Sequence, residues 1–482
     1  MTFRRRFFKD VVILGGYNYS TQIVNFLATA IVSRLLLPSE YGVVALITVF
    51  TGFIMIFTDA GLSFDIIRSD YKKTYHKSIS NLAFLMGVSL FLLMCLLAYP
   101  IALFYDNMKL ILPTIVLSTL FIIKTINIVP YALLSKEMNF NYLGRTAFLA
   151  NVLGIFFMII FAYFGLSYWA LIIPQLIASI YVYFFYSHKV NFPFRLYPHK
   201  YTVAGFRKAK SIMGNLTGFN FINYWARNAD NLIVGKVYGE ASLGIYNRAY
   251  RLLTLSINLI GGLFGRVLYP SLKKLQSEGG SIQDEYLNVL GIISLLNYPI
   301  AFILIVFPET FVFILWGENW MDVAPFLPYF GLLVLSQTLI STTGNIFILF
   351  RKERVLMYLG AVSSTIMVGS IILGSLYSVL DIARFYSLGF LAVIVPINLV
   401  VAFGKTFGFE PRKVIKFWTP KIALSLVMLF SIWTDRYLVS VTAIVLYFLH
   451  LIYFQKSDIA KIFAFAKEKA NLIKHNFFHR KN

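Results

Sequence analysis

The chain alternates long hydrophobic stretches with short polar segments over almost its whole length. A helix needs about 20 mostly apolar residues to cross the hydrocarbon layer of a membrane. Fourteen windows meet this requirement, and their hydrophobicity predicts helices rather than strands. They lie at 11–34, 42–64, 80–103, 110–133, 146–164, 168–187, 211–235, 243–265, 286–307, 325–349, 355–376, 385–404, 418–434 and 437–454. The pattern predicts an all-α membrane protein with 14 transmembrane helices.

The polar segments between these windows differ strongly in charge. With the N-terminus in the cytoplasm, the inward segments and the tail hold 34 of the 43 Lys and Arg residues. Cytoplasmic loops carry such an excess in helical membrane proteins. The longest outward segment, which ends at WGENWMDVA, has acidic residues and no basic one. Both termini are therefore expected in the cytoplasm, and the first window is expected to be an uncleaved span.

Composition agrees with the membrane class and excludes several kinds of chemistry. Hydrophobic residues make up 59% of the chain and charged residues 13%, where soluble proteins have about a quarter charged residues. The net charge of +22 follows from the inward loops, so we predict contact with membrane lipids and no nucleic-acid partner. A single cysteine and six scattered histidines predict no cofactor, no metal site and no catalytic residue. No glycine-rich nucleotide loop is present.

Two pairs of short segments indicate an internal duplication. SRLLLPSEYG at 33–42 aligns with GKVYGEASLG at 235–244, an offset of 202 residues. KEMNFNYLG at 136–144 aligns with KERVLMYLG at 352–360. Each pair falls at the same turn of a six-span unit, which predicts two parallel-repeat six-helix bundles with two further helices. The predicted parts are an N-terminal bundle at 1–188, a cytoplasmic linker at 189–210, a second bundle at 211–404, helices 13 and 14 at 405–455, and a basic cytoplasmic tail at 456–482.

Polar residues recur on one face of several spans. Asn18, Gln22 and Asn25 share a face of the first span, and Asn220 and Asn223 continue toward Arg227 and Asp230 in the seventh. Span 10 adds Gln337. Such faces line a hydrated passage or, alternatively, hold helices together through interhelical hydrogen bonds.

Five basic residues fall inside the predicted spans: Arg34, Lys124, Arg227, Arg248 and Arg251. A charge at bilayer depth costs at least about 2.5–3.5 kcal/mol, so it normally faces a cavity or a partner. Arg34 is expected at the outer interface. For Arg227, the alternative to a role in a cavity is a structural ion pair with Asp230. Lys124, with no acidic residue within a turn, is the hardest to explain as structural.

The stretch RNADNLIVGKVYGEASLGIYNRAYRL, at 227–252, resembles the hallmark of Wzx-type polysaccharide transporters. SRLLLPSEYG and LLSKEMNFNYLGR are similar to first-half signatures of that family, which shares a superfamily with multidrug extruders and the lipid II flippase. The resemblance covers essentially the whole chain. It implies a non-enzymatic flippase of a bacterial inner membrane, with a cationic cavity between two bundles. Arg227, Arg248 and Arg251 lie in the matching region.

The resemblance implies translocation of an undecaprenyl-diphosphate-linked oligosaccharide by alternating access, for O-antigen (lipopolysaccharide), capsule or exopolysaccharide. Guanidinium and ammonium groups suit its phosphates, and the amides suit its sugars. Asp59 and Asp230 are candidates for coupling to H⁺ or Na⁺, and glycan polymerases are candidate partners. The alternatives are an ion-coupled multidrug extruder, a membrane glycosyltransferase or polymerase, and a scaffold subunit without transport activity.

Overall fold

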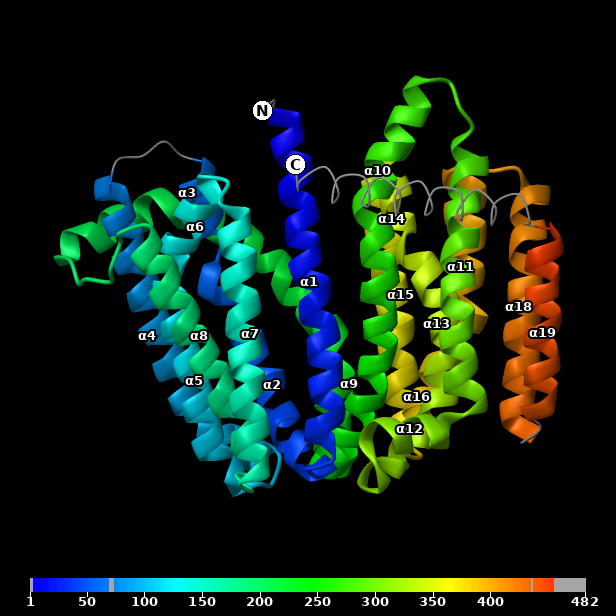
Figure 1. The fold of residues 1–482 in the computed structure, drawn as a ribbon, viewed down its shortest axis with the longest axis horizontal. Coiled ribbons are helices and arrows are strands. Elements are labelled where there is room, and N and C mark those ends of the chain that lie inside the picture. The colour runs from blue at the N-terminus through cyan, green and yellow to red at the C-terminus, as the bar shows by residue number, and fades with distance from the viewer. Residues whose placement is uncertain (1–2, 69–72, 435–436, 455–482) are drawn as a thin grey trace, which may run out of the picture. The chain divides into compact units, whose positions relative to one another are not determined.

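The computed structural model is built from helices (Figure 1). It describes residues 3–68, 73–434 and 437–454, and no strand occurs among them. The helices are α1 (Phe3–Ser33), α2 (Pro38–Asp59), α3 (Leu62–Arg68), α4 (Lys73–Phe104), η1 (Met108–Leu110), α5 (Ile111–Ile126), α6 (Ile128–Lys136), α7 (Phe140–Tyr163), α8 (Trp169–Lys189), α9 (His199–Ser256), η2 (Ile257–Gly261), α10 (Gly262–Ser277), α11 (Ile282–Val306), α12 (Pro308–Trp316), η3 (Glu318–Phe326), α13 (Leu327–Ser341), α14 (Thr343–Leu349), α15 (Glu353–Ser375), α16 (Val379–Gly389), η4 (Phe390–Ile394), α17 (Val395–Ile397), η5 (Asn398–Thr406), α18 (Pro411–Thr434) and α19 (Tyr437–Phe454). The expected all-α class is confirmed.

Ten of these helical segments are long and apolar enough to cross a membrane. They are Pro38–Ile67, Thr74–Phe104, Met108–Lys136, Phe140–Tyr163, Trp169–Lys189, Ile282–Val306, Glu318–Leu349, Glu353–Ser375, Val379–Thr406 and Pro411–Thr434. Each corresponds to one predicted window. The remaining four windows fall in α1, in α9 with η2 and the start of α10, and in α19, so the count of fourteen stays a prediction.

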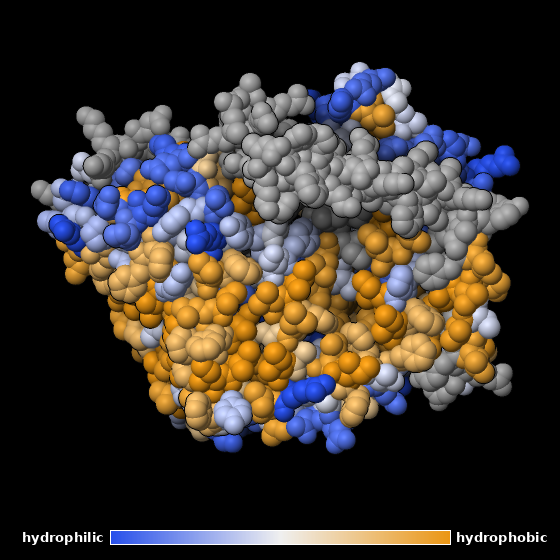
Figure 2. Space-filling model, viewed as in Figure 1, coloured by the Kyte–Doolittle hydropathy of each residue, from blue (hydrophilic) through white to orange (hydrophobic). Residues whose placement is uncertain are grey.

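The surface of the helices agrees with a lipid environment. Figure 2 shows hydrophobic side chains gathered in a broad band, with hydrophilic side chains toward the ends of the helices. Large apolar side chains such as Leu96 of α4 and Tyr163 of α7 are 77% and 76% exposed. Apolar patches of this size are rare on soluble monomers. The protein is therefore a multi-pass membrane protein.

The chain divides into two compact units. Unit 1 comprises Met1–Arg248 and Val312–Val323, and unit 2 comprises Ala249–Phe311 and Ala324–Asn482. Residues 199–248 therefore belong to the same unit as the first predicted bundle. They form most of α9, which begins inside the predicted linker and continues beyond its end. The predicted domain boundaries are not tested by this division, and the tail at 456–482 lies outside the described residues.

Several spans are interrupted within their length. In α2–α3, Ala60 and Gly61 have φ of 43° and 83°, so the helix stops and α3 restarts. In α5–α6, the break is at Asn127, three residues before Pro130, whose ring removes a backbone donor. These two interruptions divide single spans into pairs of shorter helices. In α9, by contrast, Gly239 lies between the predicted spans 211–235 and 243–265, and its φ of 80° and ψ of −174° are adopted readily only by glycine.

Unit 1 is built on packing among its own spans. α4 packs on α5, α7 on α8, and α1 on α7. The short helices α3 and α6 pack on each other and on α4, where Ile66, Ile79 and Val129 lie in one buried cluster. The interrupted spans therefore keep a continuous apolar core.

The linker between α8 and α9 is docked onto unit 1 by Asn81 of α4, which is only 4% exposed. Asn81 Nδ2 donates to Tyr197 O at 2.9 Å and to Thr202 Oγ1 at 2.8 Å. Tyr197 N donates to Asn81 Oδ1 at 3.1 Å. Ser187 of α8 adds a bond from its Oγ to Phe192 O at 2.7 Å. One buried amide thus makes three hydrogen bonds that position the start of α9.

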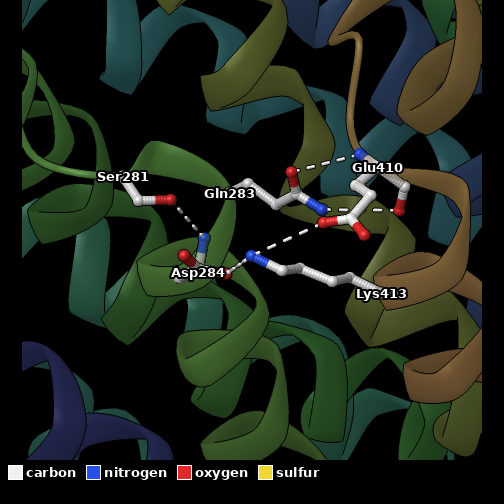
Figure 3. Close-up of polar contacts among 5 residues, drawn as sticks. All are labelled: Ser281, Gln283, Asp284, Glu410 and Lys413. Carbon is white, nitrogen blue, oxygen red and sulfur yellow. Dashed lines mark hydrogen bonds and ion pairs between the residues drawn. The ribbon is translucent and has the colours of Figure 1, made fainter.

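Unit 2 holds α18, the thirteenth predicted span, through a polar junction at its first turn (Figure 3). Lys413 Nζ lies 2.8 Å from Asp284 Oδ1 of α11 and 3.7 Å from Glu410 Oε2. Glu410 N donates to Gln283 Oε1 at 3.1 Å, and Asp284 N donates to Ser281 Oγ at 3.2 Å. α18 therefore begins at a fixed place on α11.

Replacing Asn81 with Ala should destabilise unit 1, because the substitution leaves buried groups of the linker without partners. Each buried group left unpaired costs about 1–3 kcal/mol. We expect a lower melting temperature in detergent and faster proteolysis at residues 190–200. The control is Asn139→Ala, whose side chain makes a contact at 3.4 Å with Glu137, and it should melt like the parent. Equal melting of both variants would contradict the docking role of Asn81.

Candidate functional site

Lys124 lies near the middle of the Met108–Lys136 span, one turn before the break at Asn127. Its side chain is exposed, whereas the next residue, Thr125, is fully buried against α4. α5 approaches α4 closely here, since a Cβ on Gly87 would lie 2.1 Å from Thr125 Oγ1. This close packing directs Thr125 toward α4 and leaves Lys124 on a different face of α5. An ammonium group at this depth needs water or an anion nearby.

The amide stripe of the first span is partly exposed. Asn18 and Asn25 on α1 are exposed, and Gln22 is half-buried. Asn25 Oδ1 accepts a hydrogen bond from Asn151 Nδ2 of α7 at 3.0 Å. Gln22 Oε1 is buried and has no hydrogen-bond partner among the described residues. Asn25 therefore bonds a neighbouring helix and is also exposed, so its structural role leaves the proposed passage role open.

Unit 2 carries the corresponding groups Arg251 and Gln337. Arg251 is exposed near the end of α9, and Gln337 is half-buried on α13, which packs against η2. Gln337 Oε1 is buried with no hydrogen-bond partner in the described part of the chain. Thr254 Oγ1 donates to Arg251 O at 3.0 Å, so the Thr254 hydroxyl is hydrogen-bonded to the backbone of its own helix. Among the described residues, unit 1 thus presents Lys124 and, at the predicted outer end, Arg34 as exposed cations within predicted spans, and unit 2 presents Arg251.

Arg248 lies in different surroundings, because it is only 3% exposed. Its Cζ lies 4.0 Å from the ring centroid of Tyr41, 4.5 Å from that of Trp320 and 5.3 Å from that of Trp316. Its Nη2 donates to Ser33 Oγ at 2.7 Å. We call the three aromatic residues and Ser33, together with the guanidinium that they enclose, the aromatic box. A desolvated cation over aromatic faces gains about 2 kcal/mol or more, so the guanidinium is satisfied by the protein and closed to substrate here.

The aromatic box was missed by sequence reasoning. Trp316 and Trp320 are four residues apart and belong to the outward segment that we used only for its charge. Trp320 Nε1 donates to Ser33 O at 2.7 Å and the residue is fully buried. The signal was the tryptophan pair itself, in a loop otherwise expected to be solvated.

The two candidate coupling carboxylates are both hydrogen-bonded by nearby groups. Asp59 accepts from Ser63 N at 3.0 Å and from Ser63 Oγ at 2.8 Å, which caps α3. Asp230 is buried and accepts from Asn231 N at 2.8 Å and from Tyr246 Oη at 3.2 Å. Both carboxylates therefore have a structural role in this conformation.

Three predicted residues, Asn220, Asn223 and Arg227, lie on α9 but their side chains are outside the described residues. A further basic group was overlooked: Lys421, counted as part of an inward loop, is 5% exposed within α18. Its Nζ donates to Phe417 O at 2.9 Å and lies 3.5 Å from the Phe417 ring centroid. No group of three His, Cys, Asp or Glu side chains that could hold a metal ion occurs among the described residues.

Known proteins share this architecture. The structure is similar to that of the lipid II flippase MurJ in an inward closed conformation, with a TM-score of 0.67 and 14% identity, over 92% of this chain and 99% of that one. At this identity the likeness concerns the fold.

Relatives are also found in sequence. The teichuronic acid biosynthesis protein TuaB of Bacillus subtilis (strain 168) is 24% identical over 67% of this chain and 67% of its own length. The lipopolysaccharide biosynthesis protein WzxC of Escherichia coli (strain K12) is 24% identical over 46% of this chain, which spans 45% of that protein. A family model described as polysaccharide biosynthesis protein matches residues 31–325. The chain therefore belongs to the polysaccharide biosynthesis protein family, and the resemblance to Wzx-type polysaccharide flippases is confirmed.

Proposed function

We propose that this protein translocates an undecaprenyl-diphosphate-linked oligosaccharide from the cytoplasmic to the outer leaflet of a bacterial inner membrane. Transport proceeds by alternating access and serves the biosynthesis of O-antigen, capsule or exopolysaccharide. The carrying observation is the pair of exposed cations, Lys124 in unit 1 and Arg251 in unit 2.

The relatives support this class of cargo. Two of them are named for teichuronic acid and lipopolysaccharide biosynthesis, and the structural neighbour is named as a lipid II flippase. A membrane-embedded glycan carrier needs to bind a charged headgroup and sugars while the polyprenyl tail stays in lipid. The fold supplies spans and short loops for this task.

The chemistry of the exposed groups favours an anionic cargo. The diphosphate would be bound by Lys124 and Arg251, whose donors make charge-assisted hydrogen bonds to phosphate oxygens. Asn18, Asn25 and Gln337 would contact the glycan, and Arg227, Asn220 and Asn223 remain candidates beside them. An extruder of cationic drugs would instead need exposed carboxylates, but both candidate carboxylates are already hydrogen-bonded.

A proton or Na⁺ gradient is the proposed energy source, with Asp59 and Asp230 as the candidate coupling groups. One charge moved across the membrane is worth about 2.3 kcal/mol per 100 mV. Glycan polymerases are proposed partners that receive the flipped product.

Replacing Lys124 or Arg251 with Ala should abolish most surface glycan while the protein inserts normally. A hydrogen bond to a charged group contributes about 1.5–3 kcal/mol, which predicts export about 10 to 100 times slower for each variant. Surface glycan is measured in a strain lacking the chromosomal gene, with membrane levels of each variant determined by immunoblot.

The matched controls are Lys109→Ala and Arg412→Ala, which remove the same charges at exposed positions outside the predicted passage. They should export at the parental rate. Full export by both Lys124→Ala and Arg251→Ala would refute the assignment of these cations to the diphosphate.

Flipping by the purified protein in liposomes should accelerate when a pH or Na⁺ gradient is imposed. Asp230→Asn should remove this acceleration and keep the slower, gradient-independent rate, because an amide cannot carry the proton or bind Na⁺ as a carboxylate does. Transport is followed as the appearance of lipid-linked glycan in the opposite leaflet. A parental rate that ignores both gradients would eliminate ion coupling.

A further inference from the structure

Two backbone contacts in unit 1 repeat each other at the offset found in the sequence. A Cβ on Gly42 of α2 would lie 1.8 Å from Glu240 O, and a Cβ on Gly244 of α9 would lie 2.0 Å from Pro38 O. Gly42 and Gly244 are 202 residues apart, and so are Pro38 and Glu240. The two contacts are therefore reciprocal, as in a twofold-symmetric interface. Asn107 Nδ2 reinforces one of them by donating to Glu240 Oε2 at 2.6 Å.

Two side-chain contacts follow the same symmetry. Arg34 and Lys236 occupy matching positions in the two aligned segments. Arg34 Nη2 donates to Ile314 O at 2.7 Å, and Lys236 Nζ forms an ion pair with Asp106 Oδ2 at 3.0 Å. Ile314 follows the ninth predicted span and Asp106 follows the third, so each cation reaches the corresponding loop of the other repeat.

The aromatic box lies in the same group of segments. It joins the end of α1 and the start of α2 to the 312–323 segment and to Arg248. By sequence, Arg248 and the 312–323 segment belong to the second repeat, but by contact they belong to unit 1. Each of these segments lies directly after predicted span 1, 3, 7 or 9, or at the start of the span that follows it. All of them are therefore predicted to lie at the outer end of the transmembrane helices.

From these contacts we infer that the two reciprocal glycine contacts, the two loop contacts and the aromatic box form one clasp, which closes the outer end between the repeats and separates when cargo is released. The inference rests on the proposed transport function. The glycines matter because only a residue without Cβ allows the two backbones to approach this closely. Arg248 is then a positioning residue that holds the 312–323 segment in the closed clasp.

Cross-linking tests whether the clasp opens during transport. Asn107→Cys and Glu240→Cys are introduced together with Cys95→Ser, and a bis-methanethiosulfonate reagent joins the two introduced thiols. Export of surface glycan should be lost on cross-linking and recovered after reduction. The control joins Asp284→Cys to Lys413→Cys, whose native side chains are 2.8 Å apart within unit 2, and it should leave export unchanged. Unimpaired export when the thiols at positions 107 and 240 are fully joined would overturn the clasp.

A conformational readout separates this inference from the transport proposal. Ser33→Cys, at a position that is fully buried in the closed clasp, reports opening through labelling by a water-soluble maleimide in purified protein. An open state populated at about 0.1–10% predicts that Gly42→Leu, which prevents closure, raises the labelling rate at least about tenfold. Gly360→Leu is the matched control, because nothing lies within 4 Å of a Cβ there.

The outcomes are distinguishable. If the unsubstituted protein fails to restore glycan export, the transport proposal fails and labelling alone decides the clasp. If Gly42→Leu and Gly360→Leu label at the same rate, the clasp is wrong even when export is intact. For Arg248, Arg248→Lys keeps the cation and should label like the parent, whereas Arg248→Met should label faster.

Discussion

The free energy of a charged group at membrane depth is the constraint on which the arrangement of this protein depends. A guanidinium or ammonium group within a span must be enclosed by protein or open to water. Arg248 meets the first condition through aromatic faces and Ser33. Lys124 is exposed on α5 next to the buried Thr125, and we propose that it meets the second. The same residue types therefore serve two purposes, and burial separates them.

The cost of unpaired polar groups at membrane depth also applies to the backbone of the interrupted spans. A helix that stops inside a membrane leaves peptide groups that need other partners. Asp59 supplies one at the start of α3 by accepting from Ser63 N, and Thr342, between α13 and α14, supplies another by donating from its Oγ1 to Leu339 O at 2.8 Å. The breaks at Asn127 and Thr342 are 215 residues apart, close to the offset of the aligned KE segments. This spacing supports a duplication that retained the breaks together with the sequence.

The sequence could predict the helices and the family but only part of the candidate site. Hydrophobic windows predict spans well because crossing a membrane needs about 20 apolar residues, whatever the neighbours are. Helical phase predicted that Asn18, Gln22 and Asn25 share a face, but it could not identify Asn151 as the partner of Asn25. The aromatic box was out of reach for the same reason, since Ser33 and Trp320 are 287 residues apart. Lys421 was misjudged because a lysine at the end of a basic segment resembles a solvated flank.

The placement of carboxylates decides what the exposed cations can bind. Asp59 and Asp230 accept hydrogen bonds from Ser63, Asn231 and Tyr246, so their oxygens are engaged close to their own helices. Lys124 and Arg251 form no salt bridge within the described residues. A cation that is not paired with a carboxylate of the protein can bind an external anion. Phosphate oxygens suit this role because they accept charge-assisted hydrogen bonds. The proposed selectivity for an anionic cargo thus depends on carboxylates that are already hydrogen-bonded elsewhere as much as on the positive charge of Lys124 and Arg251.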